Sequence, residues 1–132
     1  MITKVAAKII HNIELAIVEA LRNTITTYPD EAPESATYPY AVVSGRRLTI
    51  EDNISNWIME VNVWDKNKYN SRAEAKADAI EKVLDYLKIT LTDGSLVRFF
   101  KANRDDILDP DETIKRVKVD FTTTIYENES EA

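Results

Sequence analysis

Carboxylates gather in the last third of the sequence, where Asp105, Asp106, Asp109, Asp111 and Glu112 lie within one short stretch. Closely spaced oxygen ligands are the usual means of binding calcium. The stretch lacks the glycine and the terminal glutamate that an EF-hand loop carries at fixed spacing. We therefore expect a solvated acidic loop over residues 103–112 rather than a calcium site.

His11 is the single histidine, and the chain has no cysteine. A hydrolytic triad would need His11 as its base, and a transition-metal site could use only His11 and carboxylates. On a helix, His11 lies about 200° around the axis from the apolar Ile9, which predicts a solvated side chain. The sequence also lacks a glycine-rich phosphate loop. We therefore expect no catalytic, metal or cofactor site, and a protein that is not an enzyme.

The composition is that of a globular chain with an acidic surface. Of the 132 residues, 44% are hydrophobic and 30% are charged, and the formal net charge is −6. This length predicts a single domain, residues 1–132, with one core. The negative charge disfavours sequence-specific binding of nucleic acid, which usually needs a basic face. We find no signal peptide and no apolar stretch of membrane-spanning length, so we expect assembly in the cytoplasm without a membrane partner.

Apolar residues at helical spacing predict two amphipathic helices. The first covers about residues 3–23, with Glu14 on the polar side. The second covers about residues 71–88, and its opening residues Ser71 and Glu74 match a capping box.

Alternating apolar and polar residues predict the strands. Gly45 separates two short runs and indicates either a hairpin or a kinked long strand. Residues 24–39 predict a long loop, and residues 127–132 a flexible tail. The predicted strands cover residues 40–44, 46–50, 57–64, 96–101 and 117–126. The order α-β-β-β-α-β-β indicates an α+β fold, a mostly antiparallel sheet of about 4–5 strands with two helices packed on one face.

Two features of the sequence are not explained by folding alone. Arg46 and Arg47 lie at a turn in an otherwise acidic chain, and Trp57 and Trp64 point to opposite faces of one strand. If helices cover one face of the sheet, one tryptophan lies on the less protected face. Exposed aromatic residues and arginine are typical anchors of protein–protein interfaces. Trp64 is therefore either an interface residue or a side chain that packs under a loop.

Three segments resemble the tail terminator, or tail completion, proteins of long-tailed bacteriophages: Tyr38–Leu48, Ile58–Glu74 and Thr113–Tyr126. The resemblance runs from the first helix to the last strand. Its most specific part is a strand that ends in Val-Trp-Asp, followed by a short loop and a helix that opens with Arg-Ala-Glu. These motifs are structural rather than catalytic.

The resemblance implies a structural virion protein, an α+β protomer that assembles into a ring, usually a hexamer. Such a ring caps the tail tube, ends its polymerisation and joins tail to head at the head–tail junction, while DNA passes through its lumen. The implied partners are further copies of the chain, the tail-tube protein and a head-completion protein.

Ring closure needs a head-to-tail contact that is repeated around an axis. Arg46 and Arg47 could pair there with a neighbour's acidic loop, and an acidic lumen would repel DNA phosphates. The candidate interface residues are Tyr38, Tyr40, Arg46, Arg47, Trp64, Asp105, Asp106, Asp109, Asp111 and Glu112. Two alternatives remain: a head-completion or connector protein of the same junction, and a non-viral module that binds a peptide or ligand on its sheet face.

Overall fold

The described residues form two helices and six strands in the order α1-β1-β2-β3-α2-β4-β5-β6. The structure is a computed structural model that describes residues 2–51 and 54–127, with side chains for residues 9–46, 48–49 and 54–127. Apart from Glu127, the predicted tail 127–132 lies outside the described residues. The elements are α1 (Ile2–Ala20), β1 (Thr27–Pro29), β2 (Tyr40–Glu51), β3 (Ile54–Lys66), α2 (Ser71–Leu84), β4 (Lys88–Thr90), β5 (Leu96–Ile107) and β6 (Ile114–Tyr126).

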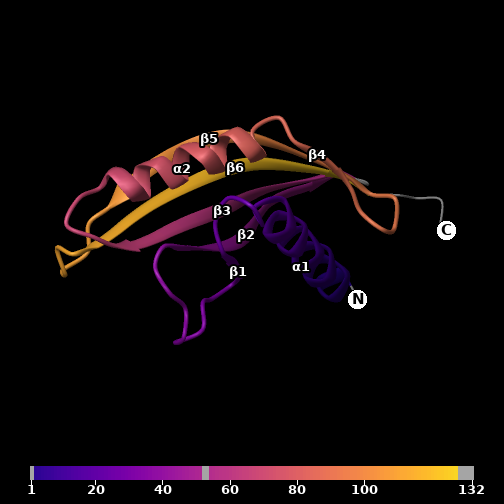
Figure 1. The fold of residues 1–132 in the computed structure, drawn as a ribbon. Coiled ribbons are helices and arrows are strands. Elements are labelled where there is room, and N and C mark those ends of the chain that lie inside the picture. Colours follow the sequence, from indigo (N-terminus) through magenta and orange to yellow (C-terminus); the bar gives the residue numbers. More distant parts are fainter. Residues whose placement is uncertain (1, 52–53, 128–132) are drawn as a thin grey trace.

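The strands form one curved sheet in the order β1-β2-β3-β6-β5-β4 (Figure 1). The four long strands pair antiparallel, whereas β1 pairs parallel to β2. The sheet is therefore mixed and six-stranded, which corrects the prediction of 4–5 strands. The short edge strands β1 and β4 were missed because three residues are too few to show an alternating pattern.

Both helices pack on the same face of the sheet, as predicted. Helix α1 contacts β1 and β2, and α2 contacts β3, β5 and β6 (Figure 1). Odd-numbered residues of β3 and β6 point at the helices and are buried, among them Met59, Val61 and Phe121. Even-numbered residues of the same strands lie on the other face, which no helix of the described chain covers and which we call the open face. Neither described helix is both long enough and apolar enough to cross a membrane.

The structure decides between two predicted alternatives and corrects one boundary. Strand β2 runs unbroken through Gly45, so the runs 40–44 and 46–50 form the predicted long strand and not a hairpin. Strand β5 continues to Ile107 because a bulge between Lys101 and Asn103 restores its pairing with β6. The predicted acidic loop is consequently confined to residues 108–113. The predicted loop 24–39 contains β1.

The predicted start of α2 is correct, but the capping box does not form. Asn70 is the N-cap and makes no side-chain capping hydrogen bond. The Glu74 carboxylate instead accepts a hydrogen bond from Arg104 of β5. Arg104 also bonds Asp78 and Glu81, so one guanidinium on β5 is held by three carboxylates of α2. Tertiary ion pairing has replaced local capping here.

Gly45 is required by the close approach of α1 rather than by a turn. A Cβ built at Gly45 would lie 2.5 Å from Ile10 Cδ1 and 2.7 Å from Met59 Sδ. We expect Gly45→Val to lower the free energy of unfolding by about 2 kcal/mol through overpacking, measured by urea denaturation. Ser44→Val, on the open face of the same strand, is the matched control. A Gly45→Val chain as stable as the wild type would contradict this packing.

Candidate protein-interaction surface

A row of aromatic side chains crosses one end of the open face. Tyr40 on β2 lies directly opposite Trp64 on β3, and Trp64 lies opposite Arg116 on β6. The Tyr40 and Trp64 rings are nearly parallel, at 12°, with centroids 6.4 Å apart. The Arg116 guanidinium lies 3.9 Å from the centre of the Trp64 ring, in cation–π contact. We call Tyr28, Tyr38, Tyr40, Trp64 and Arg116 the aromatic row.

The remaining two tyrosines extend this row toward the sheet edge. Tyr38 lies 5.4 Å and Tyr28 6.0 Å from Tyr40, measured between ring centroids. Three predicted interface residues, Tyr38, Tyr40 and Trp64, are thus brought together, with Trp64 stacked between Tyr40 and Arg116. Beside the row is an open groove of about 300 Å³, lined also by Asp30, Glu31 and Asn62.

Charged residues occupy the middle of the open face. Lys118 on β6 bonds Glu60 on β3 at 3.3 Å, and this hydrogen bond raises the pKa of Lys118. Asp120 lies 3.8 Å from Lys118, and burial raises the pKa of its carboxyl. Asp120 Oδ1 and Arg116 Nε are buried without a hydrogen-bond partner among the described residues. The open face is therefore polar and mixed in charge rather than a uniformly acidic surface.

The five acidic residues of the predicted loop are divided between strand β5 and the turn that follows it. Asp105 lies opposite Lys118 on the open face, whereas its neighbour Asp106 points to the helix face, because successive strand residues alternate. A hydrogen bond between Asp106 and Glu74 raises the pKa of Glu74.

The other three acidic residues lie in the turn between β5 and β6. Asp109 accepts a hydrogen bond from the Asp111 backbone N–H, and Asp111 accepts two from Thr113, which lower the pKa of Asp111. Glu112 is exposed in the same turn. The carboxylates of Asp109 and Asp111 are thus engaged in shaping the turn.

The two arginines of the prediction lie on β2. Arg46 is exposed opposite Ile58, so it shares the open face with the aromatic row. The side chain of Arg47 lies outside the described residues. A bulge between Arg47 and Thr49 follows immediately, so the two arginines are within a strand rather than at a turn.

Long parts of both sheet edges have no strand beside them in the described residues. Strand β1 pairs only with Ala41–Val43, which leaves residues 44–51 of β2 unpaired along their outer edge. Strand β4 pairs only with Leu96–Arg98, and further hydrogen bonds from the chain before β4 reach Lys101 of β5. Residues 102–107 of β5 are therefore unpaired along their outer edge. Two exposed leucines accompany these edges, Leu48 on β2 and Leu108 just after β5. Unpaired strand edges are templates for pairing with another chain.

The motif made of Val-Trp-Asp, residues 63–65, and Arg-Ala-Glu, residues 72–74, has a structural explanation that its spacing in the sequence does not reveal. Asp65 is fully buried and accepts hydrogen bonds from Arg72 Nε at 2.9 Å and Arg72 Nη2 at 2.5 Å. This pair closes the loop between β3 and α2. Glu74, the last residue of the motif, binds Arg104. The motif therefore holds α2 on the sheet and leaves Trp64 on the opposite face.

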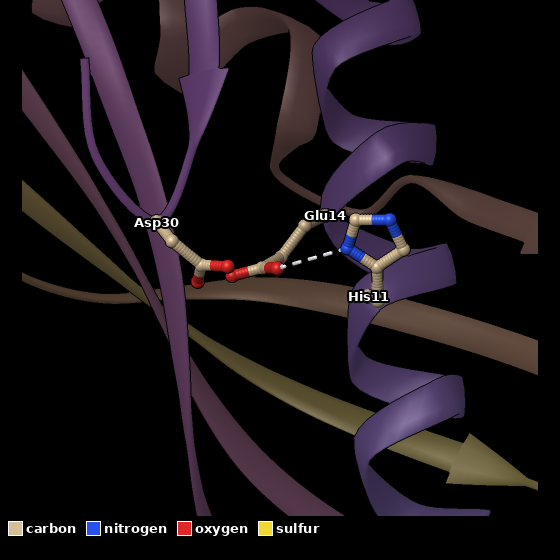
Figure 2. A group of neighbouring side chains, drawn as sticks. All are labelled: His11, Glu14 and Asp30. Carbon is tan, nitrogen blue, oxygen red and sulfur yellow. Dashed lines mark ion pairs between the residues drawn. The ribbon is translucent and has the colours of Figure 1, made fainter. Parts of the chain in front are cut away.

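A second cluster joins α1 to Asp30, which also lines the groove beside the aromatic row. Glu14 on α1 is 2% exposed, and Asp30, which follows β1, points its carboxylate at Glu14 (Figure 2). Burial, together with a hydrogen bond to Asp30 and the charge of Asp30, raises the pKa of Glu14 to about 8. His11 Nδ1 lies 3.9 Å from Glu14 on the other side. The prediction that Glu14 is on the polar side of its helix was wrong, because Glu14 turns inward toward Asp30.

We expect Trp64→Ala to lower the free energy of unfolding by about 1–2 kcal/mol, since it removes the Tyr40 stack and the Arg116 contact. A double-mutant cycle with Arg116→Ala should give a coupling of about 0.5–1 kcal/mol in urea denaturation. Ile58→Ala, on the same face of β3 but opposite Thr122, is the control and should be additive with Arg116→Ala. Additivity of Trp64→Ala as well would contradict the contact.

Comparison with known proteins agrees with this architecture. A chain from "Virion of native gene transfer agent (GTA) particle" superimposes with a TM-score of 0.65 and 13% identity, covering 84% of each chain. At that identity the likeness shows the fold alone. No curated protein sequence matches significantly. A sequence model of the family described as "Tail completion protein gp17" matches residues 14–126, which contain all six strands, α2 and the aromatic row. The chain therefore belongs to the tail completion protein gp17 family.

Proposed function

We propose that the chain forms a ring, a hexamer as the family resemblance implies, that caps the tail tube and ends its polymerisation. The ring joins the tail to the head at the head–tail junction, and DNA passes through its lumen. Membership of a tail completion family supports this proposal. The observation that carries it is the pair of unpaired, oppositely charged strand edges on the two sides of one sheet.

The two unpaired edges are suited to a head-to-tail contact. Tyr40 and Ile107 lie at one end of the sheet, and Glu51 and Leu96 lie at the other. Strand β1 covers β2 near the first end, and β4 covers β5 near the second. A neighbour shifted by about half a strand length would therefore bring the free part of its β2 beside the free part of β5, antiparallel, without collision with β1 or β4. Such strand addition is a common way to bind another chain.

Charge favours the same pairing. The free part of β2 carries Arg46 on an exposed position. The free part of β5 carries Asp105, and the acidic turn 108–113 follows it. On the open face, one free edge thus carries the basic Arg46 and the other the acidic Asp105, and opposite charges of this kind set orientation in a head-to-tail contact. An interface of this kind between two different patches forms rings when the rotation closes.

The aromatic row offers a further contact, for the tail-tube protein or the head-completion protein. Its aromatic rings and Arg116 are the residue types that dominate interface energetics. The formal net charge of −6 also suits a lumen that DNA must pass without adhering.

Electron microscopy tests the proposal directly. The purified chain is mixed with assembled tubes of the tail-tube protein from the same virus, and a disc at one end of each tube is the expected result. Tubes polymerised in its presence should also be shorter and more uniform in length. A head-completion protein would instead bind capsids and leave the tubes bare and their lengths unchanged, and that outcome would overturn the proposal.

A further inference from the structure

His11, Glu14 and Asp30 bring three metal-ligating side chains to one point. His11 and Glu14 are one turn apart on α1, and Asp30 follows β1 with a left-handed backbone, φ 65°. Figure 2 shows the Glu14 carboxylate between the other two side chains, with the Asp30 carboxylate facing it. Residues from two elements that are distant in sequence therefore converge, which is how protein metal sites are commonly built.

The spacing of the donor atoms fits one ion. One ligand atom from each of the three residues can be chosen so that all lie within 4.8 Å of one another. Bonds of about 2.1 Å to a common cation separate two donor atoms by about 3 to 4.2 Å, depending on the angle. Rotamer adjustments of less than about 1 Å therefore suffice, and the exposed His11 and Asp30 side chains are free to make them.

The charge of the cluster also favours a cation. Glu14 is buried, and the group that faces it is a second carboxylate, Asp30, so ionising both without a counter-charge is costly. A divalent ion would neutralise both carboxylates at once. The site is open to solvent on one side, since the His11 side chain is 56% exposed. Water can therefore complete the coordination of an ion that three protein ligands hold.

The ligand types indicate which ions would bind. Imidazole suits zinc, copper, nickel and iron, whereas calcium and magnesium prefer sites made of oxygen alone. We propose that His11, Glu14 and Asp30 bind one divalent transition-metal ion of the zinc class, which ties α1 to the segment that leads from β1 into β2. This inference is independent of the proposed ring, because none of the three residues lies on the unpaired edges of β2 or β5.

The single histidine makes the test specific. The full chain, without a histidine tag and stripped with EDTA before desalting, is titrated with zinc chloride at pH 7 by calorimetry. Nitrogen-15 spectra of the imidazole follow the same titration. We expect one ion per chain, a shift of the His11 ring signals and a rise in melting temperature. Magnesium chloride should produce none of these changes.

Variants separate this site from non-specific binding. His11→Ala and Asp30→Asn change exposed side chains, so both variants should fold. Each should weaken zinc binding at least about tenfold, the effect expected from the loss of one ligand. Glu34→Gln, an exposed carboxylate of the same segment, is the matched control and should bind like the wild type. Unchanged imidazole signals at millimolar zinc, or equal binding by wild type and Asp30→Asn, would overturn the proposal.

Discussion

Arg46→Glu is expected to prevent ring formation on tail tubes, and Asp105→Arg in the same chain is expected to restore it. In the proposed contact, Arg46 on the free edge of β2 lies near Asp105 on the neighbour's β5. The single substitution places like charges together at every contact of the ring. The double substitution reverses the polarity of each contact but keeps opposite charges facing.

The expected effect is large because it is repeated around the ring. Like charges that face each other across an interface cost several kcal/mol, and each 1.4 kcal/mol is about tenfold in affinity. A loss of about 100-fold in affinity at each contact between copies is therefore expected. The free-energy cost adds over all the contacts that must form together, so the loss for a closed ring is larger still. The fraction of tubes that carry a disc in electron micrographs measures it, and circular dichroism checks that each variant is folded.

A matched control is Arg22→Glu, which reverses an exposed arginine near the end of α1 that lies on neither unpaired edge. This variant should cap tubes as the wild type does. Capping by Arg46→Glu at the wild-type level would contradict the proposed contact. So would a folded double variant that fails to recover capping, since the charge pairing alone would then not explain the loss.

Glu14→Gln is expected to make the chain more stable at pH 8.5 and to leave its stability nearly unchanged at pH 5. The pKa of Glu14 is about 8 in the folded chain against an ordinary value of 4.5. Below pH 4.5 both states hold the proton. As the pH rises toward 8, the unfolded chain releases it while the folded chain keeps it, so the free energy of unfolding falls. The loss in the wild type is on the order of 4 kcal/mol.

The measurement is urea denaturation of both chains at intervals between pH 5 and pH 8.5, with EDTA present so that no cation replaces the proton. Glutamine has no charge to lose, so the difference between the two curves isolates Glu14 from Glu74 and Asp120, whose pKa values are also raised. Glu19→Gln, an exposed carboxylate on the same helix, should follow the wild type. Parallel curves for wild type and Glu14→Gln would show that Glu14 is ionised in the folded chain.

The long strands and the sides of the sheet were predictable because a strand alternates its side chains. The pattern Trp57-Ile58-Met59 through Val63-Trp64 placed Trp64 opposite the helix-covered face, and the structure confirms this. Apolar periodicity likewise located both helices. These signals are local, since each residue's direction depends only on its place in its own element.

The predicted acidic loop over residues 103–112 was wrong in its first half, because residues 103–107 belong to strand β5. The bulge after Lys101 lets β5 continue to Ile107, and the alternation of strand residues then places Asp105 and Asp106 on opposite faces. The sequence does not distinguish Arg104 from the other charged residues, yet in the fold it forms ion pairs with three carboxylates of α2. For Gly45 the sequence left open a hairpin or a long strand, because the contact with Ile10 of α1 comes from a distant part of the chain.

The sequence by itself determined the class of fold, the tryptophan that faces away from the helices and the tail completion family, because these follow from short periodic patterns and motifs. Tertiary structure alone decided which strand edges stay unpaired and which charged side chains lie along them. It also decided that Glu14, which the sequence places on the polar side of its helix, is buried against Asp30 beside His11. The physical reason is that a strand edge is free or paired, and a pKa is shifted or normal, according to residues that come from far along the chain. The order of the strands in the sheet cannot be inferred from the sequence of any single strand.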